Sequence, residues 1–305
     1  MGGVMARRSL LAALGLTGLL AACSTSPAGT TPAPRPGTPE PVPLRYGPDP
    51  SQYAVLHLPP GDPGEGAEGP LPVVVVIHGG YWRSAYGLEL GTPLAVDLTN
   101  ADVAALNVEY RRVGDGGGFP QTLDDVAAAV DLLANQGRDA ARRAGRDLDL
   151  RSVVLLGHSA GGQLAAWAAS RTRLQAPAPG ADPVVVPKGV VSQAGVLDLV
   201  AAAQQGLGGG AVVDLLGGDP IGQAARYAVA SPTALVPASC PVVAVHGTAD
   251  DTVPIDQSRR YVAAATAVRG QARLVELPGV DHFQLIDPAT PAWRTIRDEV
   301  LGLLR

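Results

Sequence analysis

The chain has 305 residues, of which 46% are apolar and 17% charged, a balance that supports one sizeable folded domain. A net charge of −5 at pH 7, without a basic patch, argues against nucleic acid as a partner. The sequence has no Cys/His cluster with metal-ligand spacing and no dinucleotide fingerprint, so it predicts neither a metal nor a cofactor.

The N-terminus has the pattern of an export signal. Arg7 and Arg8 precede a short apolar run that ends in Leu20-Ala21-Ala22-Cys23. Such a run is typical of a secretory signal and is too short for a stable membrane span. Because Leu-Ala-Ala-Cys resembles a bacterial lipobox, we expect residues 1–22 to be a lipoprotein signal peptide and Cys23 to be the lipidated first residue. The protein would then be exported and lipid-anchored to the outer face of the bacterial cell membrane; an ordinary cleaved signal is the alternative.

The segment that follows has the composition of a linker. Residues 23–45 are rich in Pro, Thr, Gly and Ser and show no apolar periodicity, which predicts a disordered tether. We expect this tether to hold a single folded domain, residues 46–305, away from the membrane. With Cys23 lipidated, Cys240 has no disulfide partner, and its place before a strand indicates a buried packing residue.

The first strong strand signal covers residues 73–77 and ends at His78-Gly79-Gly80-Tyr81-Trp82. Glycines after a strand let backbone N–H groups approach a substrate oxygen closely. We therefore predict an oxyanion hole formed by Gly79, Gly80 and Tyr81; a tight turn without such a role is the alternative. Trp82 is either a core residue or part of an aromatic wall that binds substrate.

Strands alternate with helices along the rest of the chain, the pattern of a mostly parallel sheet with helices on both faces. After the first of them, the strands are expected at residues 103–110, 153–157 and 189–194 and from about residues 241 and 274. Helices are expected at residues 88–99, 122–134 and 293–304 and directly after Ser159. Residues 198–237 lie between two central strands and have a looser pattern, which indicates a small cap or an ordinary surface excursion.

The most informative motif is Gly157-His158-Ser159-Ala160-Gly161, which lies between a strand and an alanine-rich helix. Gly-x-Ser-x-Gly in this context is typical of a nucleophile elbow, in which a strained turn exposes the serine. The helix N-terminus after Ser159 favours developing negative charge, and the N–H of Ala160 would join the oxyanion hole. His158 points sideways from the turn and is a candidate substrate-binding residue.

A serine nucleophile needs a base and an orienting acid, and in this architecture the acid precedes the histidine. Of the five histidines, only His282 follows both the serine and a carboxylate-bearing loop. That loop follows the strand at residue 241, and we choose Asp250 from it as the acid. Asp251, Asp256 and Asp281 are the alternatives; Asp281 adjoins His282, which makes a hydrogen bond to its Nδ1–H awkward.

These residues resemble the α/β-hydrolase superfamily, and within it the esterases that carry a His-Gly-Gly oxyanion motif. The block from His78 to Arg83 is similar to kynurenine formamidases and to feruloyl and acetyl-xylan esterase-like proteins. The segment from His246 to Pro254 is similar to a His-Gly-x-x-Asp-x-x-Val-Pro segment of those esterases, in which the acid falls on Asp250. The resemblance covers the chain from about residue 53 onward and implies an α/β-hydrolase fold.

The sequence thus predicts an exported serine hydrolase that cleaves esters of small or aromatic acids through an acyl-enzyme. Its partner would be a small-molecule or polysaccharide-linked ester, and no prediction is made about oligomeric state. The alternatives are an arylformamidase acting on an N-formylkynurenine-type amide, a peptidase, and a non-catalytic surface binding protein. Export argues against the formamidase, and the presence of all three triad residues argues against the binding protein.

Overall fold

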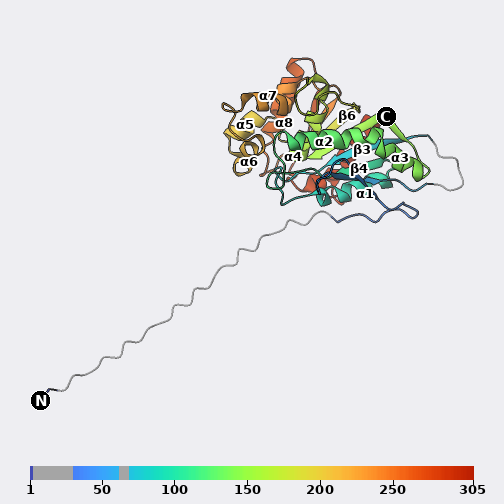
Figure 1. Ribbon diagram of the computed structural model, residues 1–305, viewed down its shortest axis with the longest axis horizontal. Helices are drawn as coiled ribbons and strands as arrows, with labels where there is room; N and C mark the ends of the chain where they lie inside the picture. The colour runs from blue at the N-terminus through green and yellow to red at the C-terminus, as the bar shows by residue number, and fades with distance from the viewer. Residues whose placement is uncertain (3–29, 62–68) are drawn as a thin grey trace.

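The computed structural model describes residues 1–2, 30–61 and 69–305 (Figure 1). The predicted signal peptide and Cys23 therefore lie outside the described residues, apart from the first two positions. Among the residues that are described, no helix is both long and apolar enough to cross a membrane.

The described residues form one sheet of eight strands, with the strand order β1-β2-β4-β3-β5-β6-β7-β8. β1 and β2 at one edge are antiparallel to their neighbours, and all other pairs are parallel. The predicted mostly parallel sheet is thereby confirmed. The strands are β1 (Val42–Arg45), β2 (Tyr53–His57), β3 (Leu71–Ile77), β4 (Ala104–Val108), β5 (Leu148–His158), β6 (Gly189–Gln193), β7 (Val242–Gly247) and β8 (Ala272–Leu277).

Helices cover both faces of this sheet (Figure 1). They are α1 (Thr92–Asn100), α2 (Gln121–Asp131), α3 (Gln136–Arg143), α4 (Ala160–Ala168), α5 (Leu199–Gln204), α6 (Leu207–Leu216), α7 (Ala224–Ala230), α8 (Asp256–Ala267) and α9 (Pro291–Leu304), with short 3-10 turns that include η1 (Leu88–Leu90) and η5 (Gln284–Ile286).

The two faces of β3 show why an uninterrupted apolar strand is needed. Val73, Val75 and Ile77 belong to the core cluster that α2 and α4 cover. Val74 and Val76 belong to a second cluster, which α1 and α9 cover. Because successive side chains of a strand point to opposite faces, a central strand buried on both sides must be apolar throughout.

The N-terminal boundary of the domain differs from the predicted one. Residues 42–45, which we predicted to be part of the tether, form β1 and pair with β2 in the register Val42 to Leu56. The prediction of a domain beginning at residue 46 was therefore wrong. Pro43 argued against a strand in the sequence, because proline lacks the N–H that a strand pairing uses. Proline is tolerated in an edge strand, where one side of the backbone needs no partner.

The predicted helices and strands from residue 73 onward occur, with small shifts at their ends. The expected helix at residues 88–99 is split into η1 and α1, and the last helix begins at Pro291. Thr290 caps that helix, because its Oγ1 accepts the N–H of Trp293 at 3.1 Å. Helices α3 and α8 were not predicted.

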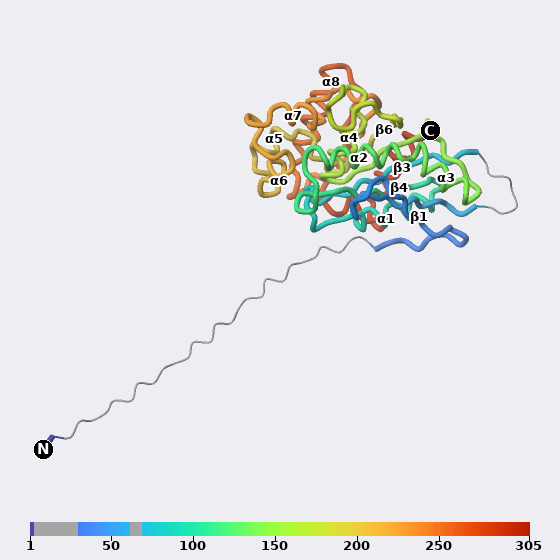
Figure 2. Tube along the Cα trace, viewed as in Figure 1, coloured from blue at the N-terminus to red at the C-terminus, as the bar shows by residue number. Residues whose placement is uncertain are grey.

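The segment at residues 198–237 is helical and connects β6 to β7. It contains α5, α6 and α7, which gather at the end of the molecule opposite α3 (Figure 2). Glycines 206 and 208–210 have φ between 62° and 85°, so the chain makes a left-handed turn where α6 begins. A cap role for this segment remains a prediction.

Two helical glycines give a matched test of packing at the end of β3. An alanine Cβ at Gly161 would lie 2.1 Å from the carbonyl oxygen of Ile77, whereas one at Gly302 would meet nothing within 4 Å. We expect Gly161→Ala to lower the free energy of unfolding by about 1–3 kcal/mol or more, because backbone must shift. Gly302→Ala should raise it by about 0.5–1 kcal/mol, since alanine favours a helix. Urea unfolding measures both; equal effects would contradict this packing.

Candidate active site

Ser159 lies at the turn between β5 and α4 with φ 56° and ψ −119°. This is a strained conformation for a residue with a side chain, and such strain persists only where the surroundings hold it. The N–H of Ser159 donates to the carbonyl of Gln193 at 2.8 Å, and its own carbonyl accepts the N–H of Gly162 at 2.9 Å. Neighbouring backbone on both sides therefore fixes the turn.

The glycines on either side of Ser159 have a steric cause. A Cβ at Gly157 would lie 2.0 Å from the carbonyl oxygen of Gly161, which a real Cβ does not tolerate. Gly161 in turn packs against the end of β3. The strand, the turn and α4 can approach this closely only because both positions lack a side chain.

The structure brings His282 and Asp250 together. His282 Nδ1 lies 2.6 Å from Asp250 Oδ2, and both side chains are buried. They come from the loops that follow β8 and β7, which are neighbours in the sheet. Asp250 Oδ1 is occupied separately, because it accepts the backbone N–H groups of Thr252 and Val253 at 2.9 and 2.8 Å.

The three alternative acids make other contacts. Asp281 Oδ1 accepts the N–H groups of Phe283 and Gln284, both at 2.9 Å, and so shapes the loop that carries the histidine. Asp251 is exposed and accepts the hydroxyl of Thr252. Asp256 is exposed beside Arg259. Among the four carboxylates considered, Asp250 has the hydrogen bond to His282.

A second histidine also faces this carboxylate. His246 Nε2 lies 2.9 Å from the carbonyl oxygen of Val253 and 3.3 Å from Asp250 Oδ2, while Ser258 Oγ lies 2.8 Å from its Nδ1. Burial alone would raise the pKa of Asp250, but hydrogen bonds from His246 and His282 outweigh it and hold that pKa well below its usual range. Asp250 is therefore ionised at neutral pH.

His158 braces the histidine loop instead of lining an open substrate site. Its Nε2 lies 3.0 Å from the carbonyl oxygen of His282, and the two rings lie 4.4 Å apart. Burial, and then the nearby charge of His282, lower the pKa of His158 well below its usual value. A neutral His158 that donates from Nε2 thus fixes the backbone of His282.

The brace from His158 connects the turn of Ser159 to the loop of His282. Among the described residues, the structure records no hydrogen bond from the Ser159 hydroxyl to His282. The residue before Ser159 holds the main chain of His282, so the two loops are fixed relative to each other. Catalytic hydrogen bonds are often long without substrate and tighten in the reacting complex.

Two of the predicted oxyanion residues, Gly79 and Ala160, adjoin Ser159. A Cβ at Gly79 would lie 3.0 Å from Ser159 Cβ, so this glycine packs directly on the serine. Gly80 and Tyr81 have φ of 109° and 53° and form a tight loop. Within the described part of the chain, the backbone N–H groups of Gly80, Tyr81 and Ala160 have no recorded acceptor. Unpaired donors beside a serine suit a developing oxyanion.

Trp82 is a core residue, and its assignment to substrate binding is corrected. Its side chain is fully buried, and its indole Nε1 donates to Gln163 Oε1 at 3.0 Å. The side chain of Tyr81 is also engaged, because its hydroxyl donates to the carbonyl of Thr252 at 2.9 Å. It thereby links residues 79–82, which we call the oxyanion loop, to the loop of Asp250.

Two exposed aromatic residues that we did not predict lie at the edge of this site. Phe283 is 48% exposed and its ring packs edge-on against His282 at 5.3 Å. Tyr86 is 45% exposed, and its ring lies where a Cβ on Gly80 would be. The adjacency of Phe283 to His282 in the sequence was the signal that could have identified it.

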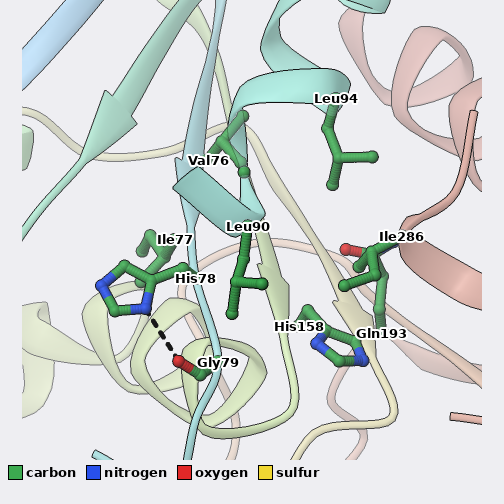
Figure 3. Close-up of a pocket in the computed structure, with 10 residues that line it drawn as sticks. Val76, Ile77, His78, Gly79, Leu90, Leu94, His158, Gln193 and Ile286 are labelled. Atoms are coloured by element: carbon green, nitrogen blue, oxygen red, sulfur yellow. Dashed lines mark hydrogen bonds between the residues drawn. The ribbon is translucent and has the colours of Figure 1, made fainter. Parts of the chain in front are cut away.

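A small cavity lies next to the end of β3 (Figure 3). His78, Gly79, His158 and Gln193 form its polar side, and Leu90, Leu94 and Ile286 its apolar side. Gln193 donates to the carbonyl of Leu285 at 2.7 Å.

Cys240 is not part of the site. Burial raises the pKa of its thiol to about 12, so the thiolate that a nucleophile requires is absent at neutral pH. The described residues also contain no group of His, Cys, Asp and Glu side chains that could hold a metal ion.

A family model described as BD-FAE matches residues 63–264, about two thirds of the chain. The chain belongs to the BD-FAE family. Ser159 and Asp250 lie within the matched range, and His282 lies beyond it.

The chain is also similar to individual proteins, at low sequence identity. This BD-FAE member is similar to a kynurenine formamidase of Salmo salar, with 25% identity over 71% of the chain and 67% of the relative. It is 24% identical to the isoprenylcysteine alpha-carbonyl methylesterase ICME of Arabidopsis thaliana over 85% of the chain, and it spans 60% of that protein. A truncated carbohydrate esterase from gut microbiota has a TM-score of 0.73 at 19% identity, covering 90% of this chain and 99% of the other. The α/β-hydrolase fold is thereby confirmed.

The low pKa of Asp250 in this BD-FAE member leads us to predict how its free energy of unfolding depends on pH. Its folded pKa lies below the ordinary value of 3.8, so its contribution to stability is present above about pH 4 and is lost as the pH falls through the folded value. The free energy of unfolding of Asp250→Asn should be lower than that of the unchanged protein at pH 6, and the difference should shrink below pH 4. Urea unfolding from pH 7 to pH 3 measures this; a difference independent of pH would contradict it.

Proposed function

We propose that this protein is a serine hydrolase that cleaves carboxylic esters of small or aromatic acids through an acyl-enzyme. The observation that carries the proposal is the 2.6 Å contact between His282 Nδ1 and Asp250 Oδ2. The serine in the strained elbow is linked to this pair through its neighbour His158, which bonds the main chain of His282. A buried carboxylate on Nδ1 fixes the imidazole so that Nε2 is left to accept a proton.

In the proposed reaction Ser159 Oγ attacks the ester carbonyl carbon while His282 Nε2 takes the hydroxyl proton. The carbonyl oxygen becomes an oxyanion, which the N–H groups of Gly80, Tyr81 and Ala160 stabilise. When the intermediate collapses, the C–O bond to the alcohol breaks, and His282 gives its proton to the departing alcohol. Water then attacks the acyl-enzyme by the same steps and releases the acid.

Several observations support an ester as the substrate. The chain belongs to the BD-FAE family, and its relatives include a methylesterase and a carbohydrate esterase. Phe283 and Tyr86 offer exposed aromatic rings on which a planar acyl group or a sugar ring could pack. We therefore propose a small-molecule or polysaccharide-linked ester.

An arylformamidase is the second candidate, favoured by the similarity to a kynurenine formamidase. The same three residues would serve, since only the leaving group changes, from an alcohol to an aromatic amine. The proposed location separates the two activities. An enzyme lipid-anchored through Cys23 outside the cell would meet extracellular polysaccharide esters.

The test is hydrolysis by the purified protein of nitrophenyl esters of increasing chain length, a feruloyl ester and N-formylkynurenine, beside Ser159→Ala. We expect ester turnover, and a loss on the order of 10⁴-fold or more in the variant because triad residues act as a unit. Ser84→Ala, which changes an exposed serine, is the matched control and should keep the activity.

The best substrate decides between the two hydrolases. Preference for N-formylkynurenine over every ester would favour the formamidase. Turnover that persists in Ser159→Ala would contradict Ser159 as the nucleophile. No turnover on any compound would contradict the hydrolase and leave a surface binding protein.

A further inference from the structure

We propose that His78 is a positioning residue that aims the N–H of Gly80 at the oxyanion, and that Glu109 and Tyr110 hold His78 in place. The inference rests on the proposed function, since it concerns an oxyanion donor of the same site. His78 does not touch the substrate; it acts through the peptide unit that joins Gly79 to Gly80.

The first step of the argument is the contact of the imidazole with this peptide unit. His78 Nδ1 lies 2.7 Å from the carbonyl oxygen of Gly79. A carbonyl oxygen can only accept, so Nδ1 carries a hydrogen and donates it. Figure 3 shows this bond beside the cavity. The side chain of His78 is fully buried, which strengthens the bond relative to one in water.

The second step is the geometry of the peptide itself. The peptide between Gly79 and Gly80 is planar, and in its trans form the C=O and the N–H point in opposite directions. Fixing the carbonyl of Gly79 toward His78 therefore fixes the N–H of Gly80 on the other side. In the described residues this N–H has no recorded acceptor, and Gly79 packs on Ser159.

The third step is the reason that the loop needs such a hold. Gly80, Tyr81 and Trp82 have positive φ in succession, at 109°, 53° and 54°. Two consecutive non-glycine residues in this region cost free energy, so the loop keeps this shape only where other contacts impose it. A bond to the first carbonyl of the loop is such a contact.

Glu109 fixes the other side of the imidazole. His78 Nε2 lies 3.1 Å from Glu109 Oε1, and the parallel pairing of Ile77 with Val108 places these two following residues side by side. An ionised carboxylate can only accept, so both ring nitrogens of His78 donate and the ring pairs with Glu109 as a cation. Burial would raise the pKa of Glu109, but hydrogen bonds from His78 and from backbone N–H groups lower it overall. Its carboxylate also pairs with Arg112 at 2.7 Å.

Tyr110 contacts both the ring and the backbone carbonyl of His78. The rings of His78 and Tyr110 stack at 4.3 Å with an angle of 11°. The hydroxyl of Tyr110 donates to the carbonyl oxygen of His78 at 2.9 Å. His78 therefore has no freedom to turn its ring away from Gly79.

Two substitutions separate the two bonds of His78. The amide nitrogen of asparagine takes about the place of Nδ1 and can donate to the carbonyl of Gly79, whereas that of glutamine takes the place of Nε2 and reaches Glu109. We expect His78→Gln to lower kcat by about 10–100-fold with KM little changed, because a misaimed donor weakens transition-state binding alone. His78→Asn should lower kcat by less than about tenfold. Affinity for a trifluoromethyl ketone, which forms an oxyanion on the serine, should follow kcat.

The controls keep the result interpretable. Thermal melting of both variants shows whether they fold, and unchanged protein and Ser159→Ala show whether the proposed hydrolase activity exists at all. If the unchanged protein is inactive, the proposed function fails; if it is active and His78→Gln equals or exceeds His78→Asn in kcat, the positioning role is overturned.

A third variant serves if neither substitution folds. Tyr110→Phe keeps the stacked ring and removes the hydrogen bond to the carbonyl of His78. The loss of this bond should lower kcat by about 3–10-fold without a rise in KM. An unchanged kcat in this variant would overturn the proposal.

Discussion

The hydrogen bond between His282 Nδ1 and Asp250 Oδ2 joins the loops that follow two neighbouring strands, β8 and β7. The geometry around it follows from the need to keep this buried pair in place. His246 and two backbone N–H groups hold the carboxylate, and His158 holds the main chain of the histidine. A buried charge with so many donors stays ionised and still, which is what an orienting acid requires.

The side chain of Tyr81 extends this network beyond His282 and Asp250. Tyr81 bonds the carbonyl of Thr252, next to the acid, and its ring fills the space where Gly208 would carry a Cβ. Gly208 belongs to the left-handed turn at the start of α6. The segment between β6 and β7 is thus packed against the same loop that borders Ser159. A shift in the position of one therefore displaces the other.

The sequence predicted those features that have a local steric or chemical cause. Gly157 and Gly161 are required where strand, turn and helix meet, and that requirement is visible as a motif. Features that depend on pairing between distant segments were missed or left open. Strand β1 exists because residue 42 pairs with residue 56, and the burial of Trp82 follows from its contact with Gln163. The contact of His78 with Glu109 likewise depends on the register of β3 against β4.

Covalent labelling tests the central claim, that Ser159, His282 and Asp250 form one nucleophilic unit, most directly. The protein is treated with a fluorophosphonate, digested, and mapped by mass spectrometry, together with His282→Gln and Asp250→Asn. The account predicts a single adduct on the peptide that carries Ser159, formed more slowly by orders of magnitude in both variants. An adduct on a different serine, or labelling of Ser159 at the same rate in all three proteins, would contradict it.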